Sequence, residues 1–312
     1  GILPAVHMGD IIASKVRKGK LPLEVLTQID HFGRYREPCV SKRYPMTRDS
    51  SHVYSGPTPA GTTFYDLVKT PDNRILAATS DGLKLTLTDD GSRWETVLTT
   101  ALPCTHVLKS ETHSGWYFAV AGNKVYYTTD LELWTEILGT GGVSVIRDIV
   151  ENDAGLIFIS TDSGVYRLDP SEFTKLYWDQ VGSLENLDPN AYGMYYDSTL
   201  STLIVSGTEG IYESSDDGDV WTKVSGIQVA SPVFSIIRVG SYHFLSSENK
   251  VFRRSAVSSV FTVIATITQA CRKLAFFEDD LYLTSDSGLL RSDSEVSIFS
   301  DTNIDFVTAF KH

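Results

Sequence analysis

The chain has few cysteines and none of the short motifs that mark common catalytic and metal centres. Its three cysteines, Cys39, Cys104 and Cys271, are odd in number and far apart, which excludes a disulfide framework and a zinc site. The seven histidines show no ligand spacing. No glycine-rich phosphate loop, His-Glu-x-x-His or Gly-x-Ser-x-Gly pattern occurs. We therefore expect no metal and no cofactor.

Long apolar runs are also missing. The N-terminal segment carries too many charges, and its apolar runs are too short, for a signal peptide or a membrane span. After residue 60 no amphipathic helical pattern interrupts the chain. We expect an all-β body with neither a secretory signal nor a membrane span.

The chain does contain a sequence pattern that recurs six times. It consists of an apolar run, a short turn of Ser, Thr, Asp, Asn or Gly, and an apolar residue. Neighbouring repeats are 42, 40, 46, 40 and 38 residues apart. A period near forty residues, built of short strands, is typical of a β-propeller whose repeats are four-stranded blades. The apolar residues that close the six repeats are Leu83, Val125, Val165, Ile211, Val251 and Leu289.

A second recurring element follows three of these repeats. The segment SSDDGDVW, residues 214–221, has the form Ser-x-Asp-x-Gly-x-x-Trp, and two other repeats keep part of it. We expect each Asp to accept hydrogen bonds from its own turn and each Trp to be largely buried between blades or against the rim. The residues are Asp89, Gly91 and Trp94, then Asp130 and Trp134, then Ser214, Asp216, Gly218 and Trp221.

This element resembles the Asp-box of the BNR-repeat propellers, which include sialidases, sortilin-type receptors, Ycf48-type photosystem-assembly factors and various virion proteins. The resemblance covers about residues 60–312, by repeat and not by residue-level identity. It implies a structural role for the boxes on the rim, far from the central channel. Metal binding or catalysis by these carboxylates is the alternative that we disfavour.

The strand that opens each repeat has a central residue, polar in most repeats, followed by two apolar ones. These central residues are expected near the propeller axis, where ligands commonly bind at one mouth of the channel. The alternative, which we favour, is a polar channel lining that recognises nothing. The candidates for the channel mouth are Asp66, His106, Asp148, Ser235, Lys273 and Thr308, and Gly193 holds the same place in one repeat.

The last of these strands, 306–310, lies two residues from the C-terminus and has nothing after it to complete a blade. A propeller that stayed open would expose a bare strand edge. We therefore predict a composite last blade, with the C-terminal strand innermost and residues 35–54 supplying outer strands. Seven blades are preferred over six.

A sialidase-like glycoside hydrolase is one alternative function. Sialidases need three arginines, a Tyr activated by a Glu, and an Asp, and their Phe-Arg-Ile-Pro motif is absent here. On paper, Arg147, Arg238 and Arg272 could be recruited with Tyr195, Tyr196 and Asp148. Arginines in strands more often form ion pairs or reach the surface, so we expect no catalysis.

The first sixty residues differ in charge from the rest. They hold nine basic and five acidic residues, which leaves 18 basic and 34 acidic residues in the remainder. We divide the chain into an arm and blade-closing segment, 1–60, and a propeller, 61–312. Residues 1–30 are expected to dock on another protein subunit, unless they wrap their own propeller. The docking candidates are Ile11, Ile12, Lys15, Val16, Arg17, Lys18, Lys20, Leu23 and Leu26.

Together these features favour a non-catalytic interaction subunit of a larger assembly. Degenerate Asp-box propellers with such an arm resemble bacteriophage tail proteins of the nozzle or fibre type, which implies a virion location; otherwise we expect the cytoplasm. A propeller that binds a surface glycan or receptor and a Ycf48-like assembly factor remain alternatives. Nucleic acid is not expected as a partner, because an acidic body with a pI near 5.0 repels phosphate.

Overall fold

The computed structural model consists of antiparallel sheets, and its described residues contain no helix. Consequently no described segment offers a helix that could cross a membrane. The described residues are 62–87, 93–171, 176–181, 190–207, 210–224, 233–258, 260–268, 270–277, 280–285, 288–292 and 306–308.

Twenty-four described strands form six sheets of four strands each. The first sheet holds β1 (Phe64–Lys69), β2 (Ile75–Thr79), β3 (Gly82–Thr86) and β4 (Trp94–Leu98), and the second holds β5 (Cys104–Lys109), β6 (Tyr117–Ala121), β7 (Lys124–Thr128) and β8 (Thr135–Ile137). The third holds β9 (Ile146–Glu151), β10 (Ile157–Thr161), β11 (Gly164–Leu168) and β12 (Asp179–Val181), and the fourth holds β13 (Ala191–Asp197), β14 (Thr202–Gly207), β15 (Gly210–Ser214) and β16 (Thr222–Lys223). The fifth holds β17 (Val233–Val239), β18 (Tyr242–Ser247), β19 (Lys250–Ser255) and β20 (Thr262–Thr266), and the sixth holds β21 (Cys271–Phe277), β22 (Asp280–Ser285), β23 (Gly288–Ser292) and β24 (Phe306–Thr308).

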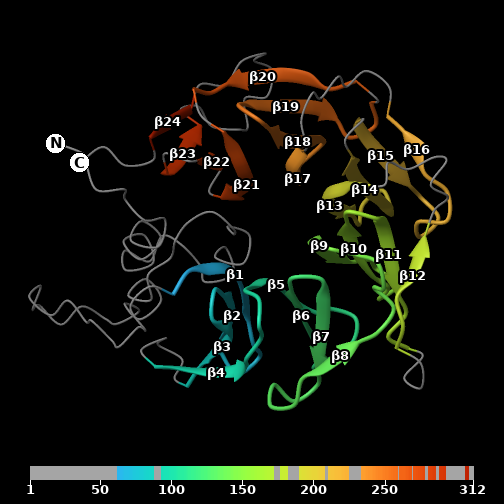
Figure 1. Ribbon diagram of the computed structural model, residues 1–312. Coiled ribbons are helices and arrows are strands. Elements are labelled where there is room, and N and C mark those ends of the chain that lie inside the picture. The colour runs from blue at the N-terminus through green and yellow to red at the C-terminus, as the bar shows by residue number, and fades with distance from the viewer. Residues whose placement is uncertain are drawn as a thin grey trace, which may run out of the picture.

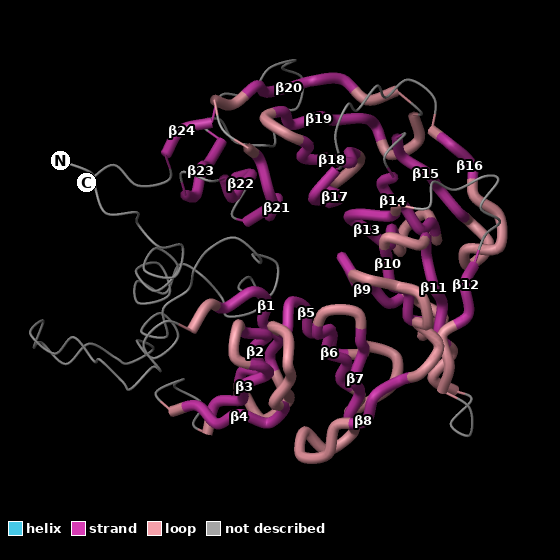
Figure 2. The backbone as a smooth tube through the Cα atoms, viewed as in Figure 1, coloured by secondary structure: helices cyan, strands magenta, loops and turns pink. Residues whose placement is uncertain are grey.

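The sheets are arranged as the blades of a propeller (Figure 1). In each sheet the first strand lies nearest the axis and the fourth lies at the periphery, and successive first strands contact one another from β1 to β21. The predicted all-β propeller of six to seven blades is therefore confirmed, with six blades among the described residues. Figure 2 shows the same arc of strands without helices.

The core lies between neighbouring blades. The second strands β2, β6 and β10 are buried at every residue, and a neighbouring blade covers β6 and β10 on each side. Apolar side chains from two adjacent blades form each cluster; Leu76 of the first blade and Val107 of the second belong to one of them. The short turns inside a blade need glycine at a few places. Gly82 has φ 107°, and a Cβ there would lie 2.3 Å from the Leu98 carbonyl oxygen.

The three box tryptophans are not equally buried. Trp221 is 4% exposed and packs in the cluster between the third and fourth blades. Trp94 and Trp134 are half-buried. Trp94 makes an edge contact with Phe64 at 5.3 Å, and Trp134 packs against the cluster between the first two blades. The prediction of rings largely buried between blades or against the rim is met most fully by Trp221, whereas Trp94 and Trp134 keep part of their surface exposed.

The prediction of an innermost C-terminal strand is wrong. Strand β24 pairs antiparallel with β23, with Arg291 opposite Val307, and forms the outer edge of the sixth blade. Thr308 is thus three strands away from the strand nearest the axis. The short apolar pattern of this segment suits an outer strand as well as an inner one, so the pattern did not decide its position. Residues 35–54, which were to supply outer strands, lie outside the described residues, as do the docking candidates in 1–30.

Candidate functional site

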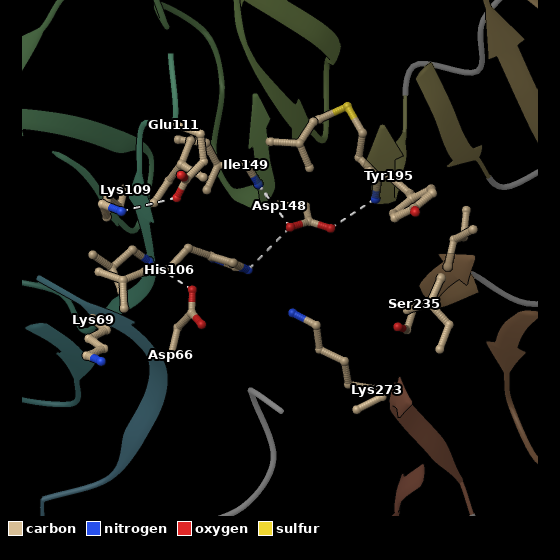
Figure 3. Close-up of a pocket in the computed structure, with 18 of the residues that line it drawn as sticks. Asp66, Lys69, His106, Lys109, Glu111, Asp148, Ile149, Tyr195, Ser235 and Lys273 are labelled. Carbon is tan, nitrogen blue, oxygen red and sulfur yellow. Dashed lines mark hydrogen bonds and ion pairs between the residues drawn. The ribbon is translucent and has the colours of Figure 1, made fainter. Parts of the chain in front are cut away.

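A cavity of about 900 Å³ opens along the propeller axis and is lined from all six blades. Five of the predicted channel-mouth residues line it: Asp66, His106, Asp148, Ser235 and Lys273. In Figure 3 they surround the cavity, and the amine of Lys273 extends toward its centre. Thr308 does not belong to this set, because β24 is peripheral.

Three of these side chains hold neighbouring blades together. Asp66 Oδ1 accepts a hydrogen bond from its neighbour Leu67 N at 2.9 Å, and its Oδ2 accepts one from Val107 N of the second blade at 3.0 Å. Asp148 repeats this arrangement: Ile149 N donates to Oδ1 at 3.0 Å and Met194 N of the fourth blade donates to Oδ2 at 2.9 Å.

The same relation joins the fifth and sixth blades through a hydroxyl group. Leu274 N donates to Ser235 Oγ at 3.2 Å. In all three cases the donor is the residue just after the central residue of the next first strand. We call Asp66, Asp148 and Ser235 the inter-blade clamps.

A β-bulge near the central residue recurs in each first strand, at the inner edge of the sheet. The pairing register between the first and second strands shifts just before or at the central residue, as between Phe64 and Asp66 in the first blade. The other five first strands show the same shift. The first strand pairs with a strand on one side only, so N–H groups along its inner edge have no backbone partner in the sheet and can donate to a side chain of the neighbouring blade. Sequence reasoning found the central residues but missed this role.

Two interfaces depart from the clamp pattern. Between the second and third blades, His106 Nε2 lies 4.0 Å from Asp148 Oδ1 (Figure 3). A hydrogen bond links His106 Nδ1 to Thr105 Oγ1 at 3.0 Å. In the fourth blade the equivalent residue, Gly193, has no side chain that could serve as a clamp. The fourth and fifth blades are instead joined by a buried ionic network.

This network runs from Arg238 through Asp197, His243 and Arg254 to Glu213. Arg238 donates to both Asp197 oxygens at 2.7 Å, and His243 Nε2 lies 2.6 Å from Asp197 Oδ2. Arg254 Nε donates to His243 Nδ1 at 3.2 Å, and Arg254 also pairs with Glu213. Because Nδ1 is the acceptor, the ring proton of His243 is on Nε2 and faces Asp197.

Burial and charge set the protonation of this network. Burial alone would raise the pKa of Asp197, but hydrogen bonds from Arg238 and His243 outweigh it and hold that pKa below its usual value. Burial, followed by the nearby Arg254 charge, lowers the pKa of His243 although Asp197 opposes the shift. The histidine is therefore neutral and the carboxylate ionised at neutral pH.

A ring of apolar side chains surrounds the cavity two residues after the central positions. From the second blade on, the residue just after the central position is buried in the cluster shared with the preceding blade, as Val107 and Met194 show. The following residue lines the cavity, packs against the cluster shared with the next blade as Leu108 does and, in five of the six blades, is half-buried. We call these six residues the apolar collar: Val68, Leu108, Val150, Tyr195, Ile237 and Ala275.

Of the residues considered for sialidase chemistry, Asp148, Tyr195 and Arg238 line the cavity, whereas Arg147 and Tyr196 do not. Arg147 donates to the carbonyl oxygens of Thr161 and Ala191 and stacks on Tyr192, while Arg238 is bound to Asp197. The side chain of Arg272 lies outside the described part of the chain.

The tyrosines of that hypothesis also lie apart. The Tyr196 hydroxyl donates to Asp153 at 3.3 Å, whereas Tyr195 belongs to the collar.

The box carboxylates are occupied by their own turns. Asp216 Oδ1 accepts from Val220 N at 2.9 Å and from Ser214 Oγ at 2.8 Å, and backbone hydrogen bonds hold its pKa below the usual value. Asp130 Oδ1 accepts from the N–H groups of Glu132 and Leu133. Gly218, with φ 88°, lies in the turn of the intact box. Asp89 and Gly91 lie outside the described residues, and the described part holds no cluster of three or more metal-ligating side chains.

The cysteines are inert in this arrangement. Cys104 and Cys271 are buried free thiols at the starts of β5 and β21. Burial raises the pKa of Cys104 to about 11 and that of Cys271 to about 12. Both remain protonated at neutral pH and act as small apolar side chains.

Comparison with known proteins supports the fold and little more. No family model and no curated protein matches the chain. Among solved structures it is similar to the extracellular domain of BT4673 from B. thetaiotaomicron, with a TM-score of 0.61 and 13% identity over 73% of this chain. The chain covers 32% of that protein, about a third of its length.

Two other similar structures differ in function from each other. Ycf48 from Cyanidioschyzon merolae has a TM-score of 0.57 and 11% identity, with 73% of this chain and 81% of that one covered, and a further structure shows Ycf48 bound to the D1 peptide. An ancestral GH74 enzyme has a TM-score of 0.58 and 14% identity over 73% of this chain and 36% of that one. At such identities the likeness establishes a β-propeller and assigns no activity.

Proposed function

We propose that this protein is a non-catalytic binding propeller that holds a segment of another protein at its central cavity. The apolar collar is the observation that carries the proposal. Five of its six side chains are half-buried around a cavity of about 900 Å³, within the size range of ligand pockets. Apolar groups that stay in contact with water at the centre of a rigid ring gain free energy when an apolar side chain covers them.

The state of the central carboxylates argues against catalysis. A general acid or base has to reach the reacting atoms of a substrate. In both Asp66 and Asp148, one oxygen accepts from the N–H of the next residue in its own strand and the other from an N–H of the next blade. These two carboxylates serve the structure of the propeller, and the third carboxylate of the cavity lining, Glu111, pairs with Lys109 at 3.3 Å.

The chemistry of the cavity suits a peptide segment. The collar offers contact to one or two apolar side chains, while the amine of Lys273, which extends toward the centre of the cavity, can donate to a carbonyl oxygen of a peptide. The Ycf48 structure with a bound peptide shows that a propeller of similar fold accepts such a ligand. The similarity to Ycf48 therefore supports the proposal that this propeller binds a segment of another protein, as an assembly factor would.

The larger hypothesis of an assembly subunit remains part of the proposal. Its basis is the charge of residues 1–60 against the acidic remainder. The reported relatives do not support a place in a phage tail, so that location rests only on the arm and the degenerate boxes. The arm would bring the partner close, and the collar would hold it.

A site-specific photo-crosslink tests the proposal. A photoreactive amino acid is placed at Leu108 in the collar, or at the control position Leu133, which is 72% exposed on a turn of the same blade. In cells that make the protein, the collar position should form covalent adducts with one other protein, and the control should not. Equal adduct patterns at the two positions, or none at Leu108, would refute binding at the cavity.

A further inference from the structure

Strand β20 differs from the other outer strands of the propeller. It is the fourth strand of the fifth blade, it has five residues, and no described strand lies beyond it. The segment 255–271 around it contains no charged residue. Outer strands β4, β8, β12 and β16 each carry a charge, and the uncharged β24 has only three residues.

The uncharged segment also exposes large apolar side chains. Val257 is 86% exposed, Val260 is 54% exposed and Val263 is 43% exposed. Phe261 and Ile264 point inward and are buried in the clusters on either side of the blade. A register shift leaves Ile264 as the extra residue of a bulge, and Thr262, Val263 and Thr266 remain exposed.

Such an edge is normally protected. The free edge of an outer strand presents unpaired N–H and C=O groups that can template another strand, and proteins guard it with charges, proline or short length. Segment 255–271 has no proline and no charge, and its residues favour β-structure. Among the described residues of this segment, the bulge at Ile264 is the only feature that protects the strand edge.

We propose that β20 pairs antiparallel with β20 of a second copy of this chain and forms a two-fold dimer. In an isologous contact the strand meets its own copy, so any charge on it would lie close to an identical charge. An uncharged strand with Thr and Val side chains avoids this repulsion, and cross-strand Thr and Val pairs stabilise the sheet. A partner strand of different sequence would place no such restriction on charge.

The overall charge of the protein strengthens this choice of contact. With a net charge of −12, two copies repel over most of their surfaces. If the two copies pair through an uncharged edge at the periphery, their other surfaces make little close contact with each other. Figure 1 shows β20 on the outside of the ring, so the pairing leaves the central cavity open in both copies.

Sedimentation velocity of the full chain over a range of concentrations tests the proposal. We expect a reversible monomer–dimer equilibrium in the unmodified protein. Val263→Lys should weaken it by about tenfold or more, because it places two like charges at the two-fold contact. Leu133→Lys adds the same charge at an exposed position of the second blade and should leave the equilibrium unchanged.

Amide hydrogen exchange on the unmodified chain gives an answer even if Val263→Lys fails to fold. Dilution should speed exchange in 262–266 and leave β4, the outer strand of the first blade, unaffected. A protein that stays monomeric at every concentration, or equal effects of the two lysine substitutions, would overturn the proposal.

Discussion

At the residue scale, the central polar side chains of this propeller act on the backbone of the neighbouring blade. Asp66, Asp148 and Ser235 each accept a hydrogen bond from a main-chain N–H of the next blade. A buried N–H without an acceptor costs free energy comparable to a lost hydrogen bond. The polar channel lining that we preferred on sequence grounds thus has a purpose that involves no ligand.

Asp148→Ala should destabilise the folded protein by about 1–3 kcal/mol, because the N–H groups of Ile149 and Met194 lose their acceptor. Water in the cavity limits the loss, since the Asp148 side chain is 20% exposed. Urea unfolding measures the change. Asp148→Asn should recover part of it, because an amide oxygen still accepts.

The matched control is Asp219→Ala, which removes an exposed ion pair with Arg167. Such pairs contribute about 0–1 kcal/mol. If Asp148→Ala and Asp219→Ala lowered the free energy of unfolding equally, the inter-blade clamp would contribute no more to stability than an exposed ion pair.

At the element scale, the first strands of alternate blades take complementary roles. The central residues of β1, β9 and β17 accept from backbone N–H groups of β5, β13 and β21, and in every first strand the residue two positions after the central one joins the collar. Alternation along a strand makes this possible, because every second side chain faces the same side. Where Gly193 breaks the pattern, the network of Asp197, Arg238 and His243 joins the fourth and fifth blades.

The network predicts a pH effect on stability. His243 faces Asp197, Arg254, Arg238 and Glu213, and its pKa in the folded protein is lowered by burial. The unfolded chain therefore binds a proton at the ordinary histidine pKa near 6.5, whereas the folded chain resists it. Stability should be full above about pH 6.5 and should fall as the pH drops below that value.

His243→Gln should flatten this decline between about pH 6.5 and pH 5, because glutamine takes up no proton. Thermal unfolding across that range is the measurement. His113→Gln, which removes a histidine that contacts the Gly155 carbonyl, should retain the unmodified slope because His243 is still present. A slope unchanged by His243→Gln would show that the buried histidine does not govern acid stability.

At the scale of the whole molecule, charge divides the chain into two parts of opposite sign. Residues 1–60 carry a net charge of +4, and the remainder carries −16. Charge of this kind speeds encounter with an oppositely charged surface more than it strengthens the final complex. The arm and the collar therefore act on different steps in the proposed interaction.

A chain that begins at residue 31 should keep the propeller fold and lose its association with the assembly. Circular dichroism and the unfolding midpoint should stay close to those of the full chain, while the crosslinked partner at Leu108 should be lost or strongly reduced. The full chain with Lys15→Ser and Lys18→Ser should give an intermediate yield of the crosslinked partner. That yield should fall further as the salt concentration rises. If the shortened chain assembled normally, the proposal would be wrong, and residues 1–30 would have the alternative role of closing the propeller.

The local features of this protein follow from its sequence. Apolar runs separated by polar turns determine hairpins, and their period near forty residues determines blades, because each blade is built from neighbouring segments. The turn bonds of Asp130 and Asp216 join residues within four positions, so a motif reveals them. The placement of five central residues around one cavity follows from the same repetition.

Other features were decided only when the blades came together. The clamps join residues 41 and 46 positions apart, and their donors lie on the inner edge strands of the next blades. The outer position of β24 depended on which sheet edge lacked a partner. A side chain that reaches the next blade contacts a residue about one repeat away, and only the packing of the ring determines which one.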